Sequence, residues 1–210
     1  MSPGRSLSDT SDLLNRTDSF GAVETHRRRY SGAVKRRTPG GGGTNGGAPL
    51  SSAVVHLLHA YADGGSRGNP GPGAAGWWLA TPAGDLLQEG GEALGVCTSN
   101  AAEYTAACRA AEAAQQAGAD GLVLHMDSRL VIEQLTRALG LGRGWATNAS
   151  HLVPYQERFR RAVAGLLAGE RDTPRLCLVW VPRERNRHAD GLVNRVLDGP
   201  APRADGPERA

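Results

Sequence analysis

The stretch that decides the fold is residues 53–73, AVVHLLHAYADGGSRGNPGPG, in which an apolar run meets an acid and then a glycine- and proline-rich segment. Residues Ala53–Ala62 are mostly apolar and predict a strand. Residues Gly64–Gly73 are dominated by turn-forming residues and predict a loop. Asp63 stands between them, directly after the strand, where sheets with flanking helices commonly place functional side chains.

Two more strands follow this loop. Residues Ala74–Ala80 and Leu86–Leu94 are strand-like, and Pro82, Gly84 and Asp85 form a turn signal between them. Because such short connections join antiparallel neighbours, the first three strands are predicted to form an antiparallel meander.

The remainder alternates helices and strands. Residues 100–117 are rich in Ala, Glu and Gln and end at Gly118, which is typical of a helix with a glycine stop. The further elements predicted from apolar periodicity are a strand at 122–126, helices at 128–139 and 152–168, a strand at 176–181 and a helix at 186–197, with a loop at 140–150. This order predicts an α/β fold: a mixed five-stranded sheet, made of the three-strand antiparallel meander plus two parallel strands, flanked by helices.

The two ends of the chain differ in composition from the middle. Residues 1–50 lack apolar periodicity and end in a glycine run, so we expect a disordered basic leader and flexible linker. Residues 51–198 are predicted to form the folded domain, and residues 199–210 a disordered tail. Residues 1–48 carry eight Lys/Arg and four Asp/Glu, a net +4, whereas the remainder carries 16 and 17, a net −1. The leader can therefore attract nucleic acid without specificity, or be a solvated tail with no role of its own.

Composition also restricts where the protein works. No run of about 18 apolar residues is present, so no membrane contact is expected, and the first residues lack the apolar core of a signal peptide. Cys97, Cys108 and Cys177 are odd in number and lack metal-site spacing, which is typical of reduced thiols. We expect a cytoplasmic protein, a monomer with no obligatory protein partner.

Four carboxylates occupy positions where elements begin or end. Asp63 and Asp127 directly follow the first and fourth strands, and Glu103 and Asp190 lie in the first turns of the helices at 100–117 and 186–197. If the two strands are parallel neighbours, their acids meet at one edge of the sheet. Asp190 also shares a helix face with apolar residues, so it faces inward.

Each acid alone has an ordinary structural explanation, as a turn residue, a helix cap or a partner of the helix dipole. Crowding all four on one side of a sheet is unfavourable unless cations lie between them. Oxygen ligands of this kind suit Mg²⁺ or Mn²⁺, and two such ions can drive phosphodiester hydrolysis.

The sequences around these acids resemble four motifs of the type I ribonuclease H family, in order and on the expected elements. They are YADGGSRGNPGPG (61–73), TSNAAEY (98–104), DSRLV (127–131) and VPRERNRHAD (181–190), the last in the form of archaeal and actinobacterial members. The resemblance spans residues 52–198. It implies a ribonuclease H-like fold and an endoribonuclease that cuts the RNA strand of RNA–DNA hybrids with two Mg²⁺ ions, for which Mn²⁺ can substitute, leaving 5′-phosphate and 3′-hydroxyl ends.

The resemblance also assigns residues. The metal-binding catalytic set is Asp63, Glu103, Asp127 and Asp190. Asn69 and Thr98 match positions that hold a phosphate of the DNA strand, and the matching positions along the RNA strand are Asn100 and the backbone at Gly64, Gly65 and Ser66. Ser99 also belongs to the predicted substrate-binding set. A glycine-rich segment lets backbone amides come close to the 2′-hydroxyls that distinguish RNA from DNA.

Two departures from the family stand out. Many members carry a histidine in a mobile loop before the last acid, thought to help product release. Here Arg183 is the candidate substitute in the catalytic set, with Arg185 as the alternative. Many members also have a basic protrusion, of which residues 140–150 keep only Arg143 and Trp145.

Two other functions remain open from the sequence. A catalytically silent nucleic-acid-binding module of the same fold is disfavoured by the intact acids. A related DNA nuclease is disfavoured by the loop and the TSN motif of residues 98–100.

Overall fold

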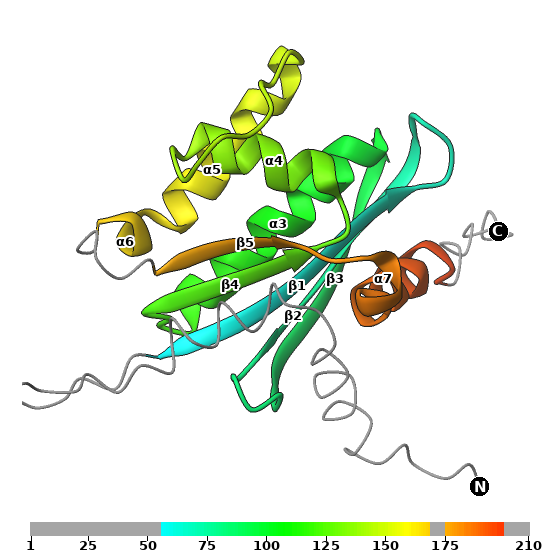
Figure 1. Ribbon diagram of the computed structural model, residues 1–210. Helices are drawn as coiled ribbons and strands as arrows, with labels where there is room; N and C mark the ends of the chain where they lie inside the picture. Colours follow the sequence, from blue (N-terminus) through cyan, green and yellow to red (C-terminus); the bar gives the residue numbers. More distant parts are fainter. Residues whose placement is uncertain (1–55, 169–174, 200–210) are drawn as a thin grey trace, which may run out of the picture. The chain divides into compact units, whose positions relative to one another are not determined.

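Five strands form one mixed sheet in the order β3-β2-β1-β4-β5 in the computed structural model, which describes residues 56–168 and 175–199 (Figure 1). The strands are β1 (Leu57–Ser66), β2 (Gly71–Ala80), β3 (Leu86–Cys97), β4 (Gly121–Met126) and β5 (Leu176–Trp180). The helices are α3 (Ser99–Gln116), α4 (Arg129–Ala138), α5 (Val153–Ala162), α6 (Ala164–Leu167) and α7 (Arg187–Leu197), with short 3-10 turns η1 (Ser150–Leu152) and η2 (Arg183–Arg185).

The strand directions confirm the predicted mixed sheet. β2 is antiparallel to β1 and β3, with Asp63 opposite Gly76. β4 is parallel to β1 and to β5, with Tyr61 opposite His125. The meander and the two added parallel strands are therefore both present, and the carboxyl end of β4 lies beside the part of β1 that carries Asp63.

Helices cover both faces of the sheet. A Cβ added to Gly64 would overlap the backbone of α3, whereas one added to Gly76, opposite Asp63, would meet α7. Successive strand residues point to opposite faces, so Gly64 and Asp63 face different helices. Consequently α3 packs on one face and α7 on the other, as Figure 1 shows.

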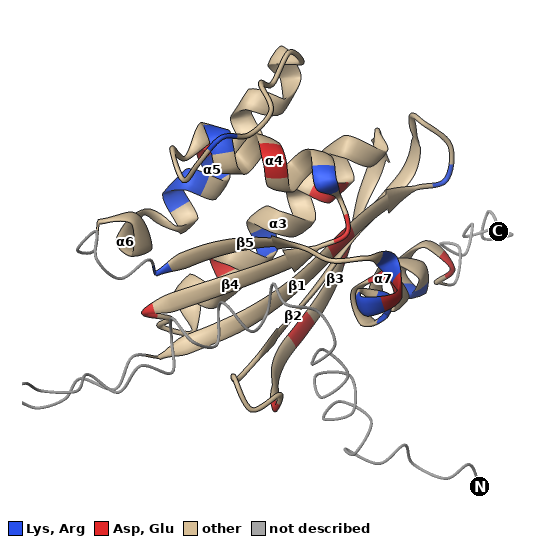
Figure 2. Cartoon of the chain, viewed as in Figure 1, with Lys and Arg blue, Asp and Glu red and all other residues tan. Residues whose placement is uncertain are grey.

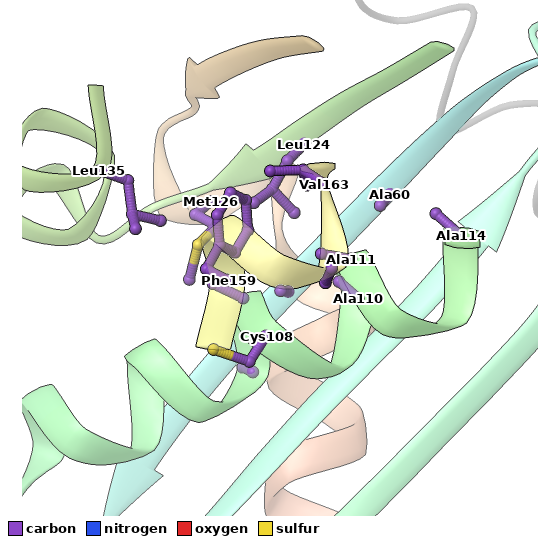
Figure 3. Close-up of a cluster of buried hydrophobic side chains, with 14 of the residues drawn as sticks. Ala60, Cys108, Ala110, Ala111, Ala114, Leu124, Met126, Leu135, Phe159 and Val163 are labelled. Carbon is purple, nitrogen blue, oxygen red and sulfur yellow. The ribbon is translucent and has the colours of Figure 1, made fainter. Parts of the chain in front are cut away.

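The core fills the α3 face. Leu58, Ala60 and Ala62 alternate along β1 and are fully buried beneath the alanine-rich side of α3. Figure 3 shows larger side chains of β4 and α5, among them Met126 and Phe159, beside the small residues of α3. Small side chains on α3 bring the helix close to the sheet, and large ones opposite fill the remaining space.

Two predicted boundaries were wrong. The loop expected at 64–73 is mostly strand, because Gly64, Gly65 and Ser66 pair with residues 73–75 and only residues 67–70 turn. Asp63 therefore lies within β1, not after it. The helix expected at 152–168 is interrupted at Val163, whose φ of −101° and ψ of 7° separate α5 from α6.

The predicted leader, linker and most of the tail lie outside the described residues, so the domain limits at 51 and 198 stay predictions. Within residues 56–168 and 175–199, no helix is long and apolar enough to cross a bilayer.

Candidate active site

Three carboxylates from three separate elements meet at one place. Asp63 on β1, Glu103 on α3 and Asp127 after β4 each offer an oxygen, and these oxygens lie within 4.8 Å of one another. Asp63 and Asp127 are close because β1 and β4 are parallel neighbours, as expected from the sequence. Three oxygen donors at this spacing can hold a divalent cation.

Glu103 reaches the cluster because Gly64 lets α3 lie against β1. A Cβ on Gly64 would overlap the backbone of Ala102 and Glu103. The Gly64 amide also donates a hydrogen bond to the Glu103 carboxylate. Glu103 is in the second turn of α3, not the first as predicted, because Thr98 is the N-cap and accepts a hydrogen bond from Ala101 N at 3.2 Å.

Burial and mutual repulsion make the carboxylates difficult to ionise together. Burial, and after it the charges of Asp127 and Asp190, raise the pKa of the Asp63 carboxyl to about 7. Burial, followed by the charges of Asp63 and Asp127, raises the pKa of Glu103 well above its usual value. Repulsion of this kind is relieved when a cation binds between the anions.

One oxygen in the cluster lacks a protein partner. Glu103 Oε2 is buried, and among the described residues nothing hydrogen-bonds to it. Because a buried carboxylate oxygen without a donor is costly, its place beside Asp63 and Asp127 fits a metal ligand. The donor set therefore fits the divalent metal that the sequence predicts.

Asp190 stands at the side of this group. Its Oδ1 accepts a 2.6 Å hydrogen bond from Arg183 Nη2, and its Oδ2 accepts a 3.0 Å hydrogen bond from Asn194 Nδ2. It is not one of the three acids that meet within 4.8 Å, but its charge acts on Asp63. Figure 2 shows acidic and basic residues together on α7, which carries Asp190.

Arg183 lies in η2, and three quarters of its side chain is exposed, at 75%. Besides its contact with Asp190, its positive charge lowers the pKa values of Asp63 and Glu103, although burial outweighs that effect. The structure thus places Arg183 at the acidic cluster.

Asn186 is a site residue that the sequence analysis missed. Its Nδ2 donates to Asp127 Oδ1 at 2.7 Å and to the Ala62 carbonyl oxygen at 2.9 Å, and the side chain is 1% exposed. Asn186 is the N-cap residue of α7, yet its side chain makes no cap hydrogen bond. No local spacing in the sequence signals this contact, because Asp127 is 59 residues away in the chain.

The predicted substrate-binding residues gather around the start of α3. Asn69 Oδ1 accepts from Ser99 N at 3.2 Å, and the hydroxyls of Ser66 and Ser99 lie 2.9 Å apart. The remaining members are Gly64 and Gly65 on β1, Thr98 at the N-cap, and the exposed Asn100 in the first turn of α3. The structure therefore brings the end of β1, the β1–β2 turn and the first turn of α3 together.

The chain is similar in sequence and in structure to known proteins of one family. Residues 61–168 match the family model described as reverse transcriptase-like. Ribonuclease HI of Halobacterium salinarum is 43% identical over 159 residues, covering 73% of each chain. The crystal structure of RNase H1 from the same archaeon has a TM-score of 0.59 at 42% identity, covering 68% of this chain and 98% of that one.

Two more solved structures are similar. The N-terminal RNase H domain of a Mycobacterium tuberculosis protein has a TM-score of 0.59 at 32% identity, covering 68% of this chain and 94% of that one. The compost-derived LC11-RNase H1, in complex with an RNA/DNA hybrid, has a TM-score of 0.57 at 32% identity, covering 67% of this chain and 96% of that one. The chain belongs to the type I ribonuclease H family, and it is a ribonuclease H enzyme.

Proposed function

We propose that this chain hydrolyses the RNA strand of RNA–DNA hybrids as an endoribonuclease with two bound divalent ions, leaving 5′-phosphate and 3′-hydroxyl ends. The observation that carries the proposal is the meeting of Asp63, Glu103 and Asp127 within 4.8 Å, with Glu103 Oε2 buried and lacking a partner among the described residues. Without a bound cation, burying such an oxygen beside two other carboxylates is energetically unfavourable.

Asp63, Glu103 and Asp127 hold the ions in this proposal, and Asp190 completes the set from α7. Mg²⁺ is the expected ion and Mn²⁺ a substitute, because all the donors are hard oxygens. When bound, a pair of such ions supplies an activated water and stabilises the charge of the leaving oxygen.

The surrounding residues hold the acids in position. Asn186 orients Asp127 through its 2.7 Å hydrogen bond, and the Gly64 amide orients Glu103. Arg183, through its 2.6 Å contact with Asp190, balances part of the negative charge and helps release the product. Positioning of this kind keeps the ligand oxygens in one arrangement before substrate arrives.

Substrate recognition rests on the region around the start of α3. Asn69 and Thr98 bind a phosphate of the DNA strand, while Ser99, Asn100 and the backbone at 64–66 follow the RNA strand. The support is their common location beside the carboxylates and the hybrid bound to LC11-RNase H1. Side chains and amides in this region can contact the 2′-hydroxyl, the group that distinguishes RNA from DNA.

A gel assay tests the proposal. End-labelled RNA–DNA, RNA–RNA and DNA–DNA duplexes are incubated with the full chain, with Mg²⁺ or with a chelator. We expect internal cuts in the RNA of the hybrid alone, only with Mg²⁺, and fragments that a kinase can label at the 5′ end only after phosphatase treatment. Cleavage of the DNA duplex, or of the hybrid in the chelator, contradicts the proposal.

A further inference from the structure

Arg129 and Trp145 form a stacked pair near the carboxylates. Arg129 is the first residue of α4 and Trp145 lies in the loop that follows α4, and the Arg129 Cζ is 5.7 Å from the centroid of the Trp145 ring. Both side chains reach solvent: Trp145 is 48% exposed and the Arg129 side chain 67%. An indole face attracts a guanidinium at this distance.

The loop that carries Trp145 is held by buried amides. Gln134 Nε2 donates to the Ala146 carbonyl oxygen at 3.3 Å, and Gln156 Nε2 donates to Thr147 Oγ1. Both glutamines are buried. The two residues after Trp145 are therefore anchored, so its exposed ring is presented by a fixed backbone.

The same amides connect this loop to the helix that carries Glu103. Tyr104, the next residue, is buried and donates from its hydroxyl to Gln134 Oε1 at 2.8 Å, while accepting from Gln156 Nε2 at 3.0 Å. On the other side of Trp145, a Cβ on Gly144 would overlap the Glu133 carbonyl oxygen of α4. The loop is thus packed tightly against α4 and tied to α3.

The terminal nitrogens of the Arg129 guanidinium are accessible to an external anion. Glu133 Oε1 lies 3.6 Å from Nε, and the ring of Trp145 covers one face. Within residues 56–168 and 175–199, no hydrogen bond uses Nη1 or Nη2 of Arg129. A stacked guanidinium keeps its in-plane N–H groups for a phosphate, which two parallel hydrogen bonds can hold.

Arg129 lies close to the carboxylates of the candidate active site. Arg129 follows Asp127 by two residues, so their Cα atoms are at most about 7 Å apart. Residues 49–210 carry 16 Lys/Arg against 17 Asp/Glu, so this region has no general positive charge with which to hold a polyanion. Binding therefore needs a few well-placed cations or the basic residues of the leader, and Arg129 is a cation close to the carboxylates.

We propose that Arg129, stacked on Trp145, is a phosphate clamp that binds the backbone of the nucleic-acid substrate next to the scissile linkage. The inference rests on the proposed hybrid-cleaving function and adds a binding residue to it. The Trp145 ring restricts the guanidinium, which reduces the conformational entropy lost when the phosphate binds.

Hybrid binding tests the clamp by fluorescence anisotropy in Mg²⁺, with every variant made in a non-cleaving Asp127→Asn background of the full chain. Arg129→Gln should weaken binding about tenfold, as loss of a charged hydrogen bond does, and should reduce the slope of log K against log salt by about 1. Arg161→Ala, which removes an exposed charge on α5, is the matched control and should change neither value.

The stacking is tested by a double-mutant cycle. Trp145→Ala should weaken binding about threefold when Arg129 is present and have no effect in the Arg129→Gln background, whereas Trp145→Phe should stay near the parent. Additive losses contradict the pairing. Equal losses in Arg129→Gln and Arg161→Ala, or an unchanged salt slope in Arg129→Gln, overturn the clamp.

Two modified hybrids identify the strand. A run of neutral methylphosphonate linkages is placed either in the DNA strand or in the RNA strand. The penalty of Arg129→Gln should disappear on one of them, and a penalty that persists on both contradicts a phosphate contact. Failure of the clamp stays distinct from failure of the function: if the chain without substitutions cleaves the hybrid while Arg129→Gln retains its kcat/KM, only the clamp is wrong.

Discussion

Asn186 and Asp127 are joined by a 2.7 Å hydrogen bond from Nδ2 to Oδ1, although 59 residues separate them in the chain. The same amide also donates to the Ala62 carbonyl oxygen, on the residue before Asp63. One buried side chain therefore holds the start of α7 against β1 and against the residue that follows β4, and it sets the direction of the Asp127 carboxylate.

Asn186→Ala should lower kcat/KM about 10–100-fold, the usual cost of removing a group that orients a metal ligand. The Mg²⁺ concentration for half-maximal activity should rise, because Asp127 is no longer held in place. A Mg²⁺ titration of hybrid cleavage measures both. Glu184→Gln, an exposed change in the adjacent η2 turn, is the control; equal behaviour of the two variants removes Asn186 from the site.

Asp63→Asn should stabilise the metal-free protein at high pH. The Asp63 pKa is raised from 3.8 to about 7, so the folded state binds a proton more tightly than the unfolded one. The contribution of Asp63 to stability is then fully present below pH 3.8 and lost as the pH rises through about 7. The Asp63→Asn substitution removes the charge and so restores this stability at high pH.

Thermal unfolding in chelator between pH 4 and 8 measures this effect. The melting temperature of Asp63→Asn should exceed that of the parent at pH 8, and the difference should shrink toward pH 4. Mg²⁺ should raise the melting temperature of the parent more than that of the variant. A difference that stays constant across this range contradicts the assigned repulsion.

Gly64→Ala should destabilise the fold by about 1–3 kcal/mol, because the new methyl group has no space against the backbone of α3. Gly165→Ala on α6 is the matched control: nothing lies within 4 Å of its added Cβ, and it should stabilise by about 0.4–1 kcal/mol. Chemical denaturation gives both values. An unchanged free energy of unfolding for Gly64→Ala means that α3 does not lie this close to β1.

Arg183→Ala should reduce kcat more than it raises KM. Since the Arg183 charge lowers the pKa values of Asp63 and Glu103, its removal should also move the acid limb of the pH–rate profile to higher pH. Arg185→Ala, two residues away, separates the two candidates that the sequence leaves open. A profile like that of the parent for Arg183→Ala excludes a role for this side chain in the mechanism.

The sequence predicted what depends on local pattern. Apolar periodicity drew attention to Asp63, Glu103, Asp127 and Asp190 as acids near the ends of elements, although Asp63 lies within β1 and Glu103 in the second turn of α3. It failed where tertiary pairing overrides local preference. Gly64 and Gly65, turn formers by composition, continue β1 because β2 supplies their hydrogen bonds.

Contacts between distant segments were likewise not predictable. The hydrogen bond of Asn186 to Asp127 requires η2 to return over β1, and no spacing in the sequence encodes that return. The stack of Arg129 on Trp145 depends in the same way on how the loop after α4 folds back. Side-chain pairs of this kind depend on tertiary packing, which the local pattern of the sequence does not show.

The most direct test of the central claim, that the clustered acids bind the metal that cleaves RNA, compares the purified chain with its Asp127→Asn variant on a labelled RNA–DNA hybrid. We predict that Mg²⁺-dependent cleavage falls by at least about a thousandfold in the variant, while its circular dichroism and melting behaviour remain those of a folded protein. Cleavage by Asp127→Asn at a rate near that of the parent would contradict the account.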